Sequence, residues 1–163
     1  ASTKWNFSKY NAGLVGGHCL PVDPYYFSYI AKKNGLKTNV TIAGRDTNEF
    51  MVKFLNKKIR KKIDFNKKFR KTSDKIIFAG LSYKKNVSDI RNSLAIKIYK
   101  KFENKNVFAF DPLIDQTKVK NMISEKKLKS LKNIKYIIFL VYHDVFKKMF
   151  VNINKDIKVL KFF

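Results

Sequence analysis

The chain has 163 residues, of which 45% are hydrophobic, so it can bury a core, and intrinsic disorder is excluded. Its formal net charge is +24, from 36 lysines and arginines against 12 acidic residues. Only four of the basic residues are arginine, the residue preferred for base and bidentate phosphate contacts. The charge therefore leaves a nucleic-acid-binding domain as a minor alternative only.

The N-terminal residues show no apolar leader. Residues 1–5 are Ala-Ser-Thr-Lys-Trp, without the hydrophobic stretch of a signal peptide. The longest apolar run, residues 136–142, has the length of a strand, not the ~18 residues of a membrane span. A single cysteine, Cys19, fits a reducing compartment. We therefore expect a cytoplasmic protein without a membrane span.

The first third of the chain predicts an irregular segment and two helices. Residues 1–15 show no helical period. Pro24 is tolerated in the first turn of a helix, which we expect to run to about Asn34 and to end at a left-handed Gly35. A second helix is predicted over residues 40–63, because apolar residues recur there at helical spacing and form a packing face: Ile42, Met51, Leu55, Ile59 and Ile63.

The remainder predicts alternating strands and helices. Residues 64–74 are polar and basic and are interpreted as a linker. We predict strands over residues 75–80, 106–110, 136–141 and 157–163, and helices over residues 93–103, 115–126 and 143–150. This alternation is typical of a parallel sheet. Ligands of such sheets bind at the carboxyl ends of strands, and residues 80–91 lie at such an end.

A cysteine segment carries the strongest chemical signal. Cys19 follows Gly16 and Gly17 and precedes Asp23 by four positions. Glycine lets the backbone approach a ligand closely, a thiol is a nucleophile, and a neighbouring carboxylate handles protons. Together they are the minimum for covalent catalysis on a carbonyl. The alternative is that Cys19 is a small buried hydrophobic residue.

Histidine adds little to this segment. His18 is adjacent to the cysteine, but adjacent side chains usually point apart, so adjacency alone is weak support for a Cys–His pair. The other histidine is His143, and no zinc-binding spacing is present. We therefore expect no metal site.

Three blocks in order resemble the UDP-glucose/GDP-mannose dehydrogenase family. Residues 13–26 are similar to its cysteine loop, and residues 43–48 to its Ala-Gly-Arg-x-x-Asn motif. Residues 80–93 are similar to the Gly-Leu-x-Phe-Lys-x-x-x-x-Asp-x-Arg-x-Ser signature of its last domain. The similarity is greatest to the branch that oxidises UDP-N-acetylhexosamines, the Vi-polysaccharide type.

The resemblance implies an α/β fold with two parts. Residues 1–63 would form the cysteine loop and a central helical dimerisation domain, with a homodimer through the 40–63 helix. Residues 64–74 would be the linker. Residues 75–163 would form a Rossmann-like, parallel-sheet UDP-binding domain, which we expect to be truncated. The family's N-terminal NAD-binding domain is expected to be missing, because the chain has no Gly-x-Gly-x-x-Gly fingerprint.

The resemblance also implies roles for the motif residues. Cys19 would attack the C6 aldehyde, giving a thiohemiacetal and then a thioester, and Asp23 would handle protons and activate water. The backbone of Gly16 and Gly17 would lie against the sugar.

Three further residues carry binding roles by the same resemblance. Lys84 and Tyr10 would bind substrate, and Arg91 would reach the phosphates of NAD. Without the family pattern, Lys84 is a solvated lysine and Arg91 a surface ion pair with Asp89.

One departure bears on activity. Asn11 stands where the family usually has a substrate-contacting arginine, so binding of a nucleotide sugar is expected to be weaker. We expect a UDP-N-acetylhexosamine 6-dehydrogenase of surface-polysaccharide synthesis that is inactive as this chain alone. The alternatives are a remnant that only dimerises or binds UDP, and the basic nucleic-acid-binding domain.

Overall fold

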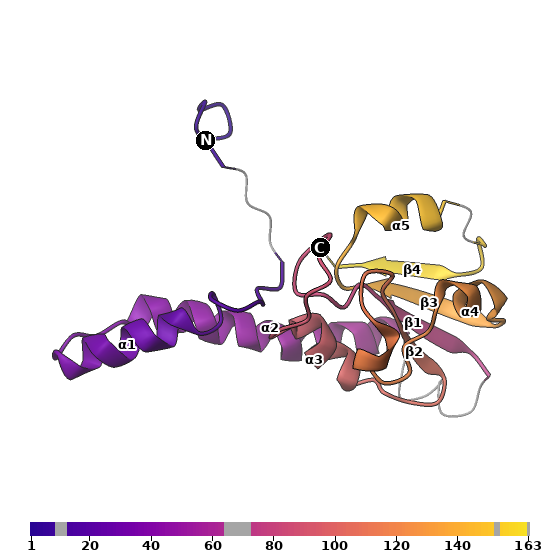
Figure 1. Cartoon of the computed structure of the whole chain (residues 1–163), viewed down its shortest axis with the longest axis horizontal. Coiled ribbons are helices and arrows are strands. Elements are labelled where there is room, and N and C mark those ends of the chain that lie inside the picture. The colour runs from indigo at the N-terminus through magenta and orange to yellow at the C-terminus, as the bar shows by residue number, and fades with distance from the viewer. Residues whose placement is uncertain (9–12, 64–72, 152–153, 163) are drawn as a thin grey trace.

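The computed structural model describes residues 1–8, 13–63, 73–151 and 154–162 (Figure 1). Its helices are α1 (Asp23–Lys33), α2 (Asn39–Ile63), α3 (Leu94–Lys100), α4 (Glu125–Ser130) and α5 (Asp144–Met149), with a 3-10 turn η1 (Gln116–Lys118). Its strands are β1 (Lys75–Ala79), β2 (Val107–Phe110), β3 (Ile134–Phe139) and β4 (Lys158–Lys161). The α/β fold is therefore confirmed; the predicted linker, residues 64–74, lies mostly outside the described residues.

The ends of α1 follow from local backbone chemistry. Pro24 occupies the first turn, where its missing N–H removes no helical hydrogen bond. At the other end Gly35 has φ +73°, and its N–H donates to the carbonyl of Lys32 while the N–H of Leu36 donates to Ala31. These are the two bonds of a Schellman motif. The predicted helix and its glycine cap are thus confirmed.

The four described strands form one parallel sheet in the order β2-β1-β3-β4. The chain runs from β1 outward to β2 and then returns past β1 to β3. The order therefore reverses between β1 and β3, which is the switch point at which open α/β sheets bind ligands. The predicted parallel sheet is confirmed, with strand ends shifted by up to two residues.

The two faces of the sheet are covered by different helices. On one face α2 and α3 pack on Ile76, Phe78 and Ile138, and on the other Leu128 of α4 and Phe146 of α5 pack on Ile77. This alternation is the period-2 rule of a strand buried on both sides.

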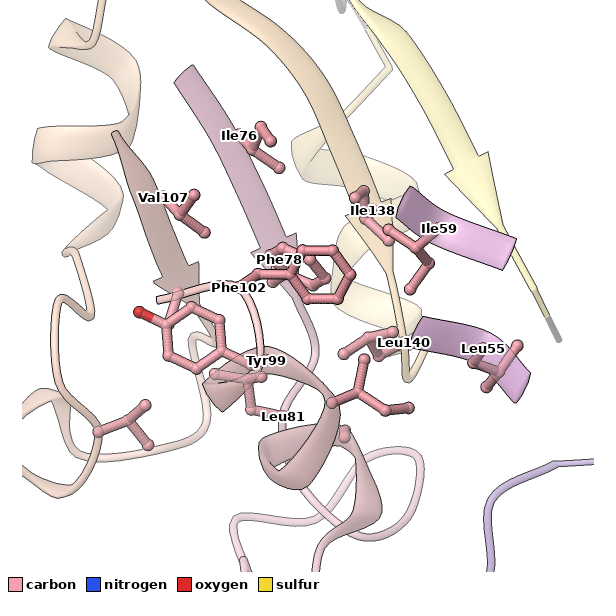
Figure 2. Close-up of a cluster of buried hydrophobic side chains, with 14 of the residues drawn as sticks. Leu55, Ile59, Ile76, Phe78, Leu81, Tyr99, Phe102, Val107, Ile138 and Leu140 are labelled. Carbon is pink, nitrogen blue, oxygen red and sulfur yellow. The ribbon is translucent and has the colours of Figure 1, made fainter. Parts of the chain in front are cut away.

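The end of α2 belongs to the core of the sheet. Leu55, Ile59 and Ile63 are at most 2% exposed. Figure 2 shows Ile59 beside Ile138 of β3, and Leu55 belongs to the same buried cluster as Leu140, the residue after β3. Each such side chain contributes about 1.5–3 kcal/mol when fully buried. The predicted packing face of this helix is confirmed over its last turns.

The helix predicted over residues 115–126 is wrong. Asp115 caps only the short turn η1, accepting from the N–H of Thr117. Asn121 then adopts φ +55°, and Met122 forms an isolated parallel bridge with Ala109 of β2. The buried Ile114, Val119 and Ile123 are spaced for an irregular segment over the core; a separate helix, α4, begins after Ser124, whose hydroxyl caps it.

Candidate functional site

The site forms where the loop after β1 meets the loop after β3. Gly80 turns the chain at the end of β1 with φ +76°. A Cβ at this position would lie 1.8 Å from the carbonyl oxygen of Val141, so only glycine lets the two loops pass each other. The predicted signature loop, residues 80–93, therefore starts at the switch point of the sheet.

A buried carboxylate holds the start of this loop. Asp111, at the end of β2, is 2% exposed. Its Oδ2 accepts from the backbone N–H of Leu81 at 2.7 Å and of Ser82 at 3.3 Å, and its Oδ1 accepts from Leu113. Burial alone raises the pKa of Asp111, but the hydrogen bonds from His143, Leu81 and Leu113 outweigh it and hold that pKa below its ordinary value.

A buried histidine completes this arrangement. His143 is fully buried, and its Nε2 lies 3.0 Å from Oδ2 of Asp111. Its Nδ1 accepts from the backbone N–H of Asn86 at 2.8 Å, so Nδ1 carries no proton and Nε2 is the donor to the carboxylate. The ring therefore makes both hydrogen bonds as neutral imidazole.

The outer part of the loop is tied to the start of α5. The amide of Asn86 donates to the Asp144 carboxylate at 2.6 Å and accepts from its backbone N–H at 2.9 Å. Lys85 pairs with the same carboxylate at 2.8 Å. Hydrogen bonds from Lys85, Asn86 and Lys147 place the pKa of Asp144 well below its usual range. Between these anchors the side chain of Lys84 is exposed, as a contact to an external ligand requires.

The cysteine loop rests on the signature loop. Gly16 and Gly17 are buried; a Cβ on Gly16 would lie 2.7 Å from the carbonyl oxygen of Asn92, and one on Gly17 would lie 2.9 Å from the Tyr83 ring. The N–H of Gly17 donates to the carbonyl of Arg91, and the Asn92 amide donates to the carbonyl of Gly17. This contact explains why both positions are glycine, because a side chain at either would collide with the signature loop. Their contact with a sugar stays a prediction.

A second anchor joins the cysteine loop to α2. The side-chain amide of Asn48 accepts from the N–H of Val15 at 3.0 Å and donates to its carbonyl at 2.8 Å. Asn48 is the last residue of the motif at residues 43–48, so this motif holds the cysteine loop at Val15, while the signature loop holds it at Gly17.

Cys19 lies in a turn immediately before α1. Its thiol is exposed and free, and its carbonyl accepts from the N–H groups of Val22 and Asp23. Its Sγ lies 3.7 Å from Nδ1 of His18, so these adjacent side chains do meet. Asp23 is the exposed first residue of α1. The alternative that Cys19 is a buried hydrophobic residue is wrong.

Arg91 faces the same region and is held by Asp89. Its Nε and Nη2 donate to the Asp89 carboxylate at 2.9 and 2.6 Å. These bonds raise the pKa of Arg91, with a weaker contribution from Cys19, and lower the pKa of Asp89. The Arg91 side chain is still 63% exposed, so part of the guanidinium faces solvent.

The structure therefore brings five of the seven predicted site residues into one assembly of two loops: Gly16, Gly17, Cys19, Lys84 and Arg91. Asp23 follows at the start of α1. Tyr10 lies outside the described residues, as does Asn11.

Sequence reasoning missed the residues that hold the loops, Asp111, His143, Tyr83 and Asn92. The available signal was position, because Asp111 and His143 each follow a strand at the edge where the signature loop lies.

Neither a metal cluster nor a membrane helix is present in the described part of the chain. Within residues 1–8, 13–63, 73–151 and 154–162, no three His, Cys, Asp or Glu side chains are grouped to hold a metal ion. No helix in those ranges is both long and apolar enough to cross a bilayer.

Sequence profiles of two domains match the chain in order. Residues 1–50 match the central domain of the UDP-glucose/GDP-mannose dehydrogenase family, and residues 77–161 match its UDP-binding domain. The chain belongs to this family. The resemblance noted from the three motif blocks is therefore confirmed.

Individual relatives are similar along nearly the whole chain. Protein CapL of Staphylococcus aureus is 32% identical over 163 residues, 96% of this chain and 38% of that protein. The UDP-N-acetyl-D-glucosamine 6-dehydrogenase of Salmonella typhi is 32% identical over 91% of this chain and 36% of that enzyme. The chain thus spans less than two fifths of these relatives' length.

Solved structures agree with the fold. The UDP-D-ManNAc dehydrogenase of Pyrococcus horikoshii superposes with a TM-score of 0.66 at 25% identity, over 99% of this chain and 38% of that one. GDP-mannose dehydrogenase of Pseudomonas aeruginosa gives 0.71 at 15% identity, over 93% and 37%; at that identity the match concerns the fold alone.

Proposed function

We propose that this chain is the C-terminal part of an NAD-dependent UDP-sugar 6-dehydrogenase. The observation that carries the proposal is the contact between the loop with Cys19 and the loop with Lys84 and Arg91, at the switch point of a parallel sheet. Oxidation of a UDP-sugar through a covalent intermediate uses a thiol nucleophile and cations that bind phosphate. Cys19 supplies the thiol, and Lys84 and Arg91 supply the cations.

The chemistry assigned to this chain centres on Cys19. The thiolate adds to the C6 aldehyde, whose oxygen takes a proton, and forms a thiohemiacetal. Loss of a hydride and a proton gives the thioester, and water then releases the uronic acid and restores the thiol. Asp23 is proposed to activate that water. Lys84 is proposed to pair with the diphosphate.

NAD would accept the hydrides when bound. The exposed part of the Arg91 guanidinium fits a phosphate of such a cofactor. The 163-residue chain holds no dinucleotide fingerprint, so we expect it to be inactive alone.

The substrate is proposed to be a UDP-N-acetylhexosamine, with the product used in surface polysaccharide. The names of the relatives support the substrate part of this proposal: UDP-N-acetyl-D-glucosamine 6-dehydrogenase and UDP-N-acetyl-D-mannosamine dehydrogenase. The division into a central part (1–63), a linker (64–74) and a UDP-binding part (75–163) stays a prediction, as does the cytoplasmic location.

A homodimer through α2 is part of the proposal. The last turns of this helix, from Leu55 on, are covered by the sheet, so the surface left for a partner lies before them, where Val40, Phe50 and Phe54 are 89%, 58% and 44% exposed. Exposed apolar patches of this kind mark interaction sites.

The proposal is tested by calorimetric titration with UDP. Lys84→Ala is expected to weaken binding about tenfold, as loss of one phosphate ion pair does, whereas Lys126→Ala removes the same charge from an exposed position on α4 and serves as the control. Equal affinity of both variants would contradict the role of Lys84.

Activity is tested in the intact protein that carries these residues, with UDP-hexosamines and NAD. Cys19→Ser is expected to stop formation of the uronic acid; normal output would exclude the nucleophile. If the unaltered protein binds UDP and forms no NADH, the remnant alternative, motivated by Asn11, replaces the dehydrogenase.

A further inference from the structure

We propose that Asp111 and His143 are positioning residues of the site: they fix residues 81–86, and through Tyr83 they set where the cysteine loop lies. This inference rests on the proposed function for its consequence in catalysis. Neither residue belongs to the groups assigned to substrate, cofactor or proton transfer above.

The buried pair of Asp111 and His143 carries an energetic cost. Burying a carboxylate and an imidazole in a sheet core is unfavourable unless each polar atom is paired. The partners are the backbone of the signature loop: Leu81 and Ser82 donate to Asp111, and Asn86 donates to His143. Two strand ends therefore supply polar groups that serve the loop between them.

Hydrogen bonds connect this pair to Lys84. The hydroxyl of Ser82 donates to the carbonyl of Lys84 at 2.7 Å and lies 3.4 Å from Nε2 of His143. Asn86, held by His143 through its backbone N–H, lies two residues beyond Lys84 and has φ +59°. The backbone of Lys84 is thus fixed on both sides, so the exposed side chain starts from a fixed point on the loop.

The same loop also contacts the segment that carries Cys19. Tyr83 lies between Ser82 and Lys84, and its ring is the surface on which Gly17 rests. Gly17 is two residues before Cys19. A shift of residues 82–84 would therefore move the cysteine loop and Lys84 relative to each other, and a misplacement of 1 Å is enough to cost a large factor in rate.

Histidine suits its place because it accepts at one ring nitrogen and donates at the other. His143→Phe keeps the ring that packs 5.2 Å from Phe146 and removes both hydrogen bonds. His143→Gln keeps one donor and one acceptor on a side chain of similar reach. The first variant separates the polar role from packing, and the second tests whether donor and acceptor restore it.

The experiment compares these variants in the intact protein with Tyr99→Phe, which loses a part-buried hydrogen bond to the carbonyl of Lys120 away from the loop. Hydrogen exchange is followed at residues 81–92 and 13–20, and UDP affinity is measured by calorimetry. We expect His143→Phe to speed exchange in both segments and to weaken UDP binding about tenfold, with partial recovery in His143→Gln. Tyr99→Phe is expected to change neither.

Unchanged exchange at residues 81–92 in a folded His143→Phe protein would overturn the inference, and so would equal effects of His143→Phe and Tyr99→Phe. If His143→Phe does not fold, His143→Gln and Asp111→Asn take its place in the comparison. Unperturbed exchange and affinity in both of these variants would overturn the inference. If the unaltered protein binds no UDP, the proposed function fails, and the exchange measurement alone decides the positioning role.

Discussion

The cysteine segment with α1 and the parallel sheet with its helices are held in different ways. In α1 only Ala31 is buried, and Tyr26, Phe27 and Ile30 are 68%, 60% and 55% exposed. In β1 four of five residues are buried. The sheet is therefore stabilised by its own core, whereas the segment that carries the nucleophile buries little of its apolar surface and is held by a few hydrogen bonds.

The largest effect is expected where the sheet and its loop meet. Gly80→Ala places a methyl group 1.8 Å from the Val141 carbonyl oxygen at a φ of +76°, and we expect a loss of about 3–5 kcal/mol of unfolding free energy. Urea denaturation measures it. Gly44→Ala, in α2 with nothing within 4 Å, is the control and is expected to stabilise by about 0.5–1 kcal/mol.

A smaller effect is expected from separating the two loops. Gly16→Ala meets the carbonyl oxygen of Asn92 at 2.7 Å and is expected to cost about 2 kcal/mol. Hydrogen exchange should rise at residues 13–20 and stay constant in β1. Gly13→Ala, which contacts nothing within 4 Å, should leave both unchanged. A rise in β1 as well would mean that the cysteine loop and the sheet unfold together.

The anchor on α2 is expected to be worth about 1–2 kcal/mol, because Asn48→Ala removes two hydrogen bonds to Val15. Release of the cysteine loop from α2 is also followed through the alkylation rate of the exposed Cys19 thiol. We expect this rate to differ between Asn48→Ala and the unaltered protein. Thr47→Ala, whose hydroxyl donates within its own helix to the carbonyl of Ala43, is the neighbouring control; equal changes in both variants would exclude a specific role for Asn48.

Acid is expected to weaken the sheet through Asp111. Its folded pKa is below the ordinary 3.8, so the stability that it contributes is fully present above pH 3.8 and is lost as the pH falls through the lower folded value. Thermal unfolding between pH 5 and pH 2.5 should therefore show a smaller acid loss in Asp111→Asn than in the unaltered protein. Asp156→Asn, an exposed position, is the control.

The smallest effect on folding is expected on α1. Tyr26→Ser removes a side chain that is 68% exposed, so unfolding free energy should change by no more than about 0.5 kcal/mol. Sedimentation velocity is expected to show less self-association, since the variant reduces an apolar surface. Unchanged association would restrict the dimer interface to α2.

Much of the fold was predictable because its signals are local. The alternation of apolar segments indicated the sheet, and Pro24 and Gly35 indicated the ends of α1. The helix prediction for residues 115–126 failed although the composition of this stretch permits a helix. The stretch is divided by the capping residues Asp115 and Ser124 and by the left-handed Asn121.

The candidate site was predictable in its reactive residues and not in what supports them. Cys19, Lys84 and Arg91 lie within recognisable motifs, whereas Asp111 and His143 are 32 residues apart and meet only because parallel strands end at one edge. No local pattern reports that pairing. The role of the glycines against Tyr83 likewise required the path of both loops.

The strand order has a consequence for the time course of folding. The central strand β1 pairs with β2 and, on its other side, with β3, whose Tyr136 lies opposite Ile76. During synthesis the core shared by β1 and the last turns of α2 can close only after residue 140 has been made, because that core includes Ile138 and Leu140. Because non-local pairing is slow, these segments are the ones that nascent chains would expose to chaperones.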